Sequence, residues 1–141
     1  MKVRTELAST DRDVPRRRLA LLARRVLAGE GSPLDVTIVF TDDATLRELN
    51  SSFRGIDRTT DVLSFNIPPV AKLAGDAGEI YISVPQARRQ ARRYRHSLAA
   101  ELERLVVHGV LHVLGHDHKK PAEAGRMRAR EARYVGGAAC L

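Results

Sequence analysis

The sequence predicts a single α/β (α+β) domain over residues 1–141, in which helices pack on a small mixed β-sheet of about four strands. Two observations support this fold class. Residues 35–40 and 61–67 are β-branched or alternate between polar and apolar side chains, as strands do, whereas residues 19–27 repeat apolar side chains at helical spacing. The composition, with 43% hydrophobic and 29% charged residues, is ordinary for a globular protein, and no linker, repeat or low-complexity tract divides the chain.

The N-terminal segment is expected to form a strand followed by a helix. Residues 2–7 form the strand, and the helix starts near Pro15, because proline is favoured in a first helical turn. From Leu19 onward the helix carries apolar residues at positions i, i+3, i+4, i+7 and i+8, and it ends at Gly29 and Gly31. This single apolar stripe predicts that one face of the helix packs on the rest of the domain.

The next segment is expected to form a strand, a short helix and a loop. Residues 35–40 are rich in β-branched side chains and form the strand. Residues 41–43, Thr-Asp-Asp, cap the short helix that carries Leu46 and Leu49. Residues 51–60 then form a polar loop.

The second half of the chain begins with two more strands, residues 61–67 and 79–83. Ser83 and Gln86 have the spacing of a capping box, so a helix begins there and continues to Tyr94. Two further helices complete the predicted fold. Their expected limits are Ser97 to Leu114, with Gly115 ending the helix, and Pro121 to about Val135.

The net charge of +7 predicts a polyanionic partner, either nucleic acid or an acidic membrane surface. The arginines gather in two groups, which comprise Arg16, Arg17, Arg18, Arg24 and Arg25 and then Arg88, Arg89, Arg92, Arg93 and Arg95. The alternative interpretation is that both groups are solvated helix faces. The sole cysteine, Cys140, cannot form an internal disulfide, and no apolar run resembles a signal peptide or a membrane span. We therefore expect a cytoplasmic protein and exclude the secreted, membrane and disulfide-scaffold classes.

Four of the five histidines lie between positions 108 and 118, which predicts a metal site at the end of the long helix. His108 and His112 are four residues apart and project from one helix face. Gly115 lets the chain turn back, so that His116 or His118 can supply a third nitrogen. We prefer His118, because the longer excursion lets it face the helix.

Three neutral imidazoles and a water molecule are typical of a catalytic Zn²⁺ site, and Ni²⁺ or another divalent ion also suits such donors. A structural site would recruit cysteine, so the donors favour catalysis. Gly109 stands where zinc peptidases of the His-Glu-x-x-His type carry their catalytic glutamate, which disfavours a peptidase. Glu101 lies on the same helix face as His108 and is either a supporting residue for the metal ligands or simply solvated. His96 is interpreted as a hydrogen-bonded residue without a metal role.

Three segments resemble the YbeY family of bacterial rRNA maturation factors, which are single-strand-specific endoribonucleases. The first is the histidine segment HGxLHxxGxDH at residues 108–118, which is similar to the metal-binding signature of that family. The other two are NSSFRG at 50–55 with TDVLSF at 60–65, and GEIYIS at 78–83, and all three occur in the family's order. The sequence departs from the family at position 116, where His replaces the usual Tyr, and at position 79, where Glu replaces Asp.

The resemblance implies that His108, His112 and His118 hold a zinc-like ion and that Arg54 faces the same cleft as a further catalytic residue. A guanidinium there could bind phosphate oxygens and stabilise developing charge. Without the resemblance, Arg54 would be interpreted as a solvated loop residue.

The resulting hypothesis is a metal-dependent endoribonuclease for 16S rRNA 3′-end maturation and ribosome quality control, in which the ion activates a water molecule against the scissile phosphate. Its expected partners are ribosomal RNA and the ribosome or small-subunit proteins, with the two arginine groups on RNA backbone and no membrane involved. Three Phe, three Tyr and no Trp leave little surface for base stacking, so selectivity is expected to come from a ribosomal partner. Two alternatives are a metallohydrolase of another class, such as a peptidase, and a ribosome-associated binding factor with a structural metal.

Overall fold

The computed structural model describes residues 1–8, 11–67, 77–115 and 121–135. Its elements, in chain order, are β1 Val3–Leu7, α1 Arg16–Gly29, β2 Asp35–Thr41, α2 Asp43–Arg54, β3 Val62–Ile67, β4 Ala77–Ser83, α3 Val84–Arg93, α4 Leu98–Val113 and α5 Pro121–Tyr134. No helix within these ranges is long and apolar enough to cross a membrane.

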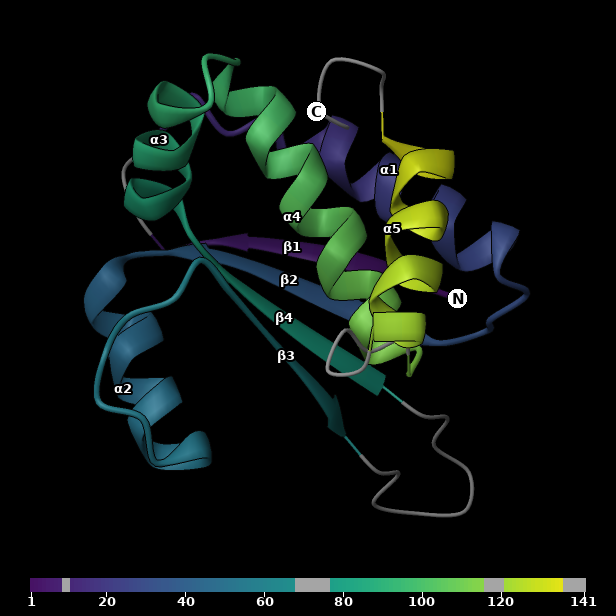
Figure 1. Ribbon diagram of the computed structural model, residues 1–141, viewed down its shortest axis with the longest axis horizontal. Coiled ribbons are helices and arrows are strands. Elements are labelled where there is room, and N and C mark those ends of the chain that lie inside the picture. The colour runs from purple at the N-terminus through teal and green to yellow at the C-terminus, as the bar shows by residue number, and fades with distance from the viewer. Residues whose placement is uncertain (9–10, 68–76, 116–120, 136–141) are drawn as a thin grey trace.

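The four strands form one mixed sheet in the order β1-β2-β4-β3 (Figure 1). β1, β2 and β4 are parallel neighbours, whereas β3 pairs antiparallel with β4 and forms one edge of the sheet. This arrangement confirms the predicted α/β fold class with a small mixed sheet. It also gives β3 a backbone edge to which no described strand is hydrogen-bonded.

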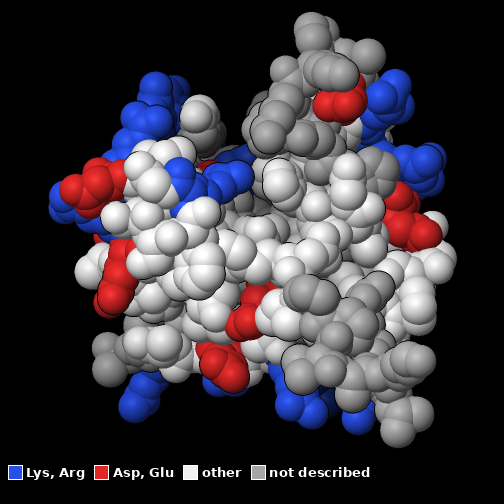
Figure 2. Space-filling model, turned by 90° about the horizontal axis from the view of Figure 1, so that it is seen from below, with Lys and Arg blue, Asp and Glu red and all other residues white. Residues whose placement is uncertain are grey.

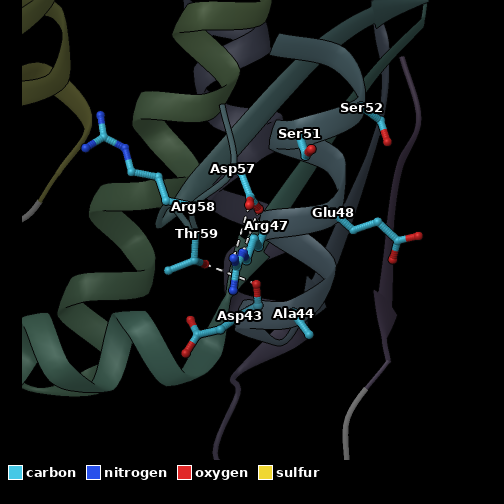
Figure 3. A pocket seen from close by; sticks show the side chains of 9 residues that line it. All are labelled: Asp43, Ala44, Arg47, Glu48, Ser51, Ser52, Asp57, Arg58 and Thr59. Carbon is cyan, nitrogen blue, oxygen red and sulfur yellow. Dashed lines mark hydrogen bonds and ion pairs between the residues drawn. The ribbon is translucent and has the colours of Figure 1, made fainter. Parts of the chain in front are cut away.

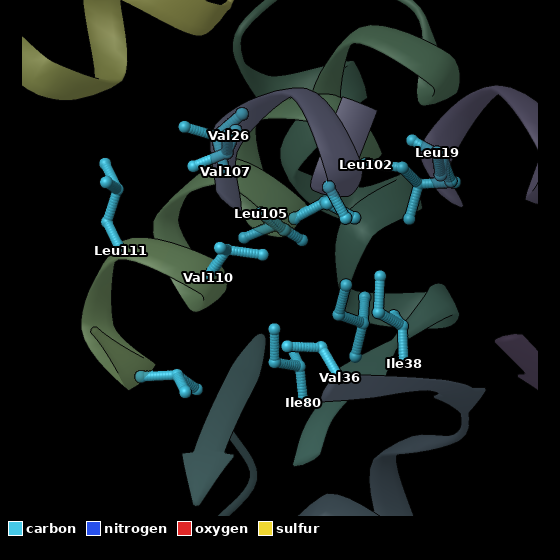
Figure 4. Packing of buried hydrophobic residues seen from close by; sticks show 14 of the residues in the cluster. Leu19, Val26, Val36, Ile38, Ile80, Leu102, Leu105, Val107, Val110 and Leu111 are labelled. Carbon is cyan, nitrogen blue, oxygen red and sulfur yellow. The ribbon is translucent and has the colours of Figure 1, made fainter. Parts of the chain in front are cut away.

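The hydrophobic core lies between one face of the sheet and helices α1 and α4 (Figures 1 and 4). Val36, Ile38 and Ile80 point from the sheet toward Leu105 and Val110 of α4, and all five side chains are almost completely buried. A Cβ atom added to Gly109 would lie 2.7 Å from Cγ2 of Ile80, so α4 lies against β4 at a distance that only glycine permits.

The opposite face of the sheet is covered by α2 only near one end (Figure 1). Because side chains alternate along a strand, Leu63 and Phe65 of β3 and Glu79 and Tyr81 of β4 project toward this face. Leu63 is buried, whereas the other three are half-buried. This face is therefore less apolar and more accessible than the core face.

Helix α2 ends at Arg54, so the prediction of a loop over residues 51–60 is wrong for its first four residues. The Phe53 ring packs against Phe65, with ring centroids 5.2 Å apart, and this contact extends the helix by one turn. Gly55 then ends the helix with a φ of 68°, a conformation that glycine adopts without strain. Arg54 thus projects from the last turn of a helix and not from a flexible loop.

Candidate functional site

A cavity of about 190 Å³ lies where the end of α2, the edge strand β3 and helix α4 meet. Arg54, His108 and His112, three of the residues predicted to form the site, line this cavity. The other lining residues belong to the segment that leads into β3 and to the first three residues of that strand, namely Thr60, Asp61, Val62, Leu63 and Ser64. The fold therefore brings Arg54 to two histidines that lie far from it in the sequence.

Two hydrogen bonds fix the histidine-bearing part of α4 to the edge strand. The Ser64 hydroxyl donates to the carbonyl oxygen of Gly109 at 3.1 Å, and the Asn66 amide donates to that of Val113 at 3.0 Å. These contacts lie on either side of His112 along the helix. The cavity wall formed by β3 therefore keeps a fixed position relative to the imidazoles.

The loop that follows Arg54 is also anchored. Asn50 is a buried residue of α2, and its side-chain amide donates to the carbonyl oxygen of Arg58 at 2.9 Å. The Thr59 hydroxyl donates to the backbone carbonyl oxygen of Asp43 at 3.1 Å. The loop is thus tied to both ends of α2, so the helix end that carries Arg54 is held in place.

The two imidazoles lie on successive turns of α4, with ring centroids 6.2 Å apart and ring planes inclined by 35°. Nδ1 of His108 lies 2.7 Å from a carboxylate oxygen of Glu131 on α5. A carboxylate at Nδ1 fixes the tautomer of a histidine, so that Nε2 is the nitrogen that would bind a metal ion. Glu131 could not be predicted from the sequence, because it belongs to another helix and no short-range spacing connects it to His108.

His118 and the alternative ligand His116 lie outside the described residues. Within the described part of the chain, no three His, Cys, Asp or Glu side chains are grouped closely enough to hold a metal ion. The described residues nevertheless fit a metal ion, because they provide two imidazoles on one helix face with a carboxylate orienting the first. The third ligand predicted from the sequence, His118, stays a prediction.

Comparisons with known proteins identify the family. The family model for YbeY, described as Endoribonuclease YbeY, matches residues 5–138. The chain belongs to the YbeY family. It is 46% identical over 127 residues to Endoribonuclease YbeY of Moorella thermoacetica, covering 84% of this chain and 80% of the relative. It is 43% identical over 125 residues to Endoribonuclease YbeY of Pelotomaculum thermopropionicum, covering 84% and 82%.

The fold is similar to the solution structure of TM1509 from Thermotoga maritima, with a TM-score of 0.65 and 28% identity over 94% of this chain and 86% of that protein. The resemblance to the YbeY family inferred from three sequence segments is therefore confirmed over nearly the whole chain. Residues of two of these segments, in α2, β3 and α4, line one cavity, and the third segment forms β4, which pairs with β3.

In this member of the YbeY family, Glu101 is fully buried, so the interpretation of it as a solvated residue is wrong. Its carboxylate accepts hydrogen bonds from Gln90 at 2.7 Å and Arg104 at 2.6 Å, and it lies 2.7 Å from Nε2 of His96. It makes no described contact with His108. His96 is therefore a hydrogen-bonded residue, as the sequence interpretation expected.

Burial by itself would raise the pKa of the Glu101 carboxyl, but the hydrogen bond and charge of Arg104, with two further hydrogen bonds, outweigh it and hold the pKa below its ordinary value. Arg104 also lies 3.7 Å from Asp61, which lines the cavity. The buried network of Glu101, Arg104, Gln90 and His96 therefore contacts the cavity wall through Asp61. Within the network, Glu101 and Arg104 form an ion pair.

The second arginine group is partly used within the protein. Arg88 forms ion pairs with Asp11 at 2.6 Å and Asp13 at 3.0 Å, and Arg89 forms one with Asp43 at 2.7 Å. These arginines connect α3 to other segments of the domain. Their charge is therefore less available to an external phosphate than the sequence suggested.

A larger surface depression, of about 720 Å³, lies on the outer side of α2 (Figure 3). The Arg47 guanidinium and the Asp57 carboxylate pair across it at 2.8 Å. The residues that line this depression include no histidine. The chemistry expected of the YbeY family is therefore assigned to the smaller cavity, which contains both described histidines of the family signature.

Proposed function

We propose that this chain is a metal-dependent, single-strand-specific endoribonuclease that acts in 16S rRNA 3′-end maturation and ribosome quality control in the cytoplasm. The observation that carries the proposal is the meeting of Arg54, His108 and His112 at one cavity in a member of the YbeY family. The curated relatives of this family are named endoribonucleases, which supports RNA as the substrate. Ribosomal RNA and small-subunit proteins are the proposed partners.

The proposed ligands of one Zn²⁺ ion, or of Ni²⁺ or another divalent ion, are His108, His112 and His118. When bound, such an ion supplies a Lewis acid that polarises a phosphate oxygen and lowers the pKa of a water molecule. Glu131 acts as a positioning residue, because its carboxylate holds the Nδ1 proton of His108 and orients the ring.

Arg54 binds the substrate phosphate. Its guanidinium can donate two parallel hydrogen bonds to two phosphate oxygens, and this bidentate contact strengthens as negative charge develops during cleavage. The edge strand β3 and the anchored loop keep the Arg54 side of the cavity fixed relative to the histidines. The substrate is thereby held between the arginine and the imidazoles.

A peptidase function is disfavoured by the packing at Gly109. The glutamate of the His-Glu-x-x-His motif would occupy this position, but even a Cβ atom would lie 2.7 Å from Ile80. The helix is too close to the sheet for any side chain to project there. Position 109 therefore cannot carry the glutamate that serves as general base in those peptidases.

The proposal is tested by removing divalent metal with a chelator, restoring Zn²⁺, and measuring cleavage of three substrates. These are a single-stranded precursor fragment of the rRNA 3′ end, the same fragment in a duplex, and an unstructured peptide. We expect cleavage of the single strand only, its loss on chelation and its return with Zn²⁺, with unchanged circular dichroism. Unfolding on chelation would support the structural-metal alternative, and peptide cleavage would contradict the proposal.

A further inference from the structure

We propose that Phe53 and Phe65 form a stacking subsite for a nucleobase of single-stranded RNA, next to the phosphate site at Arg54. This inference rests on the proposed function, because it assigns a place to the base attached near the bound phosphate. It concerns residues outside the cavity and outside the histidine segment.

Three aromatic rings form a continuous row across the open face of the sheet. The Phe53 and Phe65 centroids are 5.2 Å apart with ring planes inclined by 59°, and the Phe65 and Tyr81 centroids are 5.9 Å apart at 76°. The rings come from α2, β3 and β4. Composition predicted little stacking surface, but the fold gathers half of the six Phe and Tyr residues in this row.

Phe53 presents most of its ring to solvent. Its exposed fraction of 68% is the largest among the described large hydrophobic side chains, although its inner edge is fixed against Phe65. A planar ring that is exposed on one side and supported on the other can accept a base without rearrangement. Base–aromatic stacking of this kind tolerates every base, because each has a π-face.

The row adjoins the cavity along both chain segments that build its wall. Phe53 directly precedes Arg54 in α2, and Phe65 directly follows Ser64 in β3, while Arg54 and Ser64 both line the cavity. The Ser64 and Phe65 side chains leave β3 on opposite faces, but Leu63 projects to the same face as Phe65 and also lines the cavity. The row and the cavity therefore meet at the edge of β3, beside the helix end that carries Phe53 and Arg54.

The charges around the aromatic row favour one orientation of a bound RNA strand. The Tyr81 hydroxyl donates to the Glu79 carboxylate at 2.7 Å, and Glu79 lies opposite Phe65 in the sheet, so a carboxylate borders the row on the side of β4. Figure 2, which shows the molecule from below the view of Figure 1, has a broad uncharged area, with Asp or Glu atoms just below its middle and Lys and Arg mainly at the margins. An RNA strand would place a base on the uncharged area and its phosphate at the arginine.

The chain contains no tryptophan, so Phe53→Trp creates a protein with a single tryptophan reporter at the subsite. The titrant is a phosphorothioate oligouridine of about eight nucleotides, compared with an abasic oligonucleotide of equal charge. We expect the oligouridine, but not the abasic strand, to quench the Trp fluorescence. Leu21→Trp on α1 is the matched control, because Leu21 is 59% exposed and lies outside the aromatic row.

Affinity measured by fluorescence anisotropy completes the test. Phe53→Ala is expected to weaken oligouridine binding about 5-fold or more, Phe53→Tyr to preserve it, and Leu21→Ala to leave it unchanged. Equal affinity of wild type and Phe53→Ala, or equal quenching by the abasic strand, would overturn the subsite and leave the proposed function standing. Failure of the wild-type protein to bind any oligonucleotide would overturn both.

Discussion

Two histidine–carboxylate pairs lie near the two ends of helix α4. They have the same N–O distance but differ in burial, in neighbouring groups and in the ring nitrogen that is bonded. His96 and Glu101 near the start of the helix are 2.7 Å apart, as are His108 and Glu131 near its end. The first pair has side-chain exposures of 13% and 0%, and its carboxylate also receives Arg104. The second has exposures of 23% and 21% and lies at a cavity that a second histidine also lines.

The comparison teaches that a histidine–carboxylate hydrogen bond does not by itself mark a functional site. In the first pair Nε2 is bonded, and the surrounding groups complete a closed network that stabilises the packing of α3 on α4. In the second pair Nδ1 is bonded, so Nε2 is the nitrogen that would bind the proposed metal ion. The first pair is therefore expected to affect folding and the second to affect metal binding.

The largest difference between the two ends of α4 is expected from His112→Ala compared with His96→Ala. Removal of a metal ligand should abolish stoichiometric Zn²⁺ binding and reduce RNA cleavage by at least about 10²-fold. His96→Ala should retain both, because this residue contacts Glu101 and not the cavity. Metal analysis of the purified variants and a cleavage assay measure the two effects. Full Zn²⁺ content in a His108→Ala, His112→Ala double variant would contradict the assigned ligands.

Glu101→Ala should be the most destabilising change in the buried network. It leaves Arg104 without its principal partner, and breaking a buried ion pair costs about 3–5 kcal/mol of unfolding free energy. Urea denaturation measures this cost. The folded fraction should still bind Zn²⁺ with wild-type affinity, whereas a stable Glu101→Ala protein with impaired metal binding would move Glu101 to the metal site.

Glu131→Gln should weaken metal binding with little change in stability, the opposite of the result expected for Glu101→Ala. Loss of the carboxylate that orients His108 is expected to weaken Zn²⁺ binding about 10–100-fold, as measured by competition with a chromophoric chelator. The free energy of unfolding without metal should change by less than about 1 kcal/mol, because the pair is partly exposed. Unchanged Zn²⁺ affinity would show that Glu131 has no role in positioning the ligand.

The smallest expected effect is a dependence of stability on pH. The folded-state pKa of Glu101 is lowered, so its contribution is complete above the ordinary value of 4.5 and is lost as the pH falls through the folded-state pKa. Chemical denaturation at successive acidic pH values should show a slope of up to about 1.4 kcal/mol per pH unit from this group. In Glu101→Gln this part of the slope should disappear. An identical dependence of stability on pH in the wild type and Glu101→Gln would show that Glu101 is not the group responsible.

The sequence predicted the features that depend on local spacing. The apolar stripe of α1, the four strands and the pairing of His108 with His112 on one helix face all follow from helical and strand periodicity. The end of α2 was missed because it depends on Phe53 meeting Phe65 across a turn and a loop. A contact between separate elements leaves no periodic signal.

The chemistry around the histidines was predictable only in part for the same reason. Glu131 reaches His108 from another helix, and Glu101 is buried by partners on α3 and in the turn before α4. The place of Arg54 beside the histidines came from resemblance to a family and not from its loop-like surroundings. The predicted third ligand, His118, lies outside the described residues and stays a prediction.

The central claim is that the cavity between Arg54 and the histidines is the RNA-cleaving centre. It is tested most directly by comparing Arg54→Ala with Arg58→Ala, a neighbouring arginine that lines the other depression. With Zn²⁺ restored, Arg54→Ala should keep full metal content and cleave the single-stranded rRNA fragment about 10²–10³-fold more slowly, whereas Arg58→Ala should cleave at a rate close to wild type. Equal rates for Arg54→Ala and wild type at equal metal content would contradict the claim.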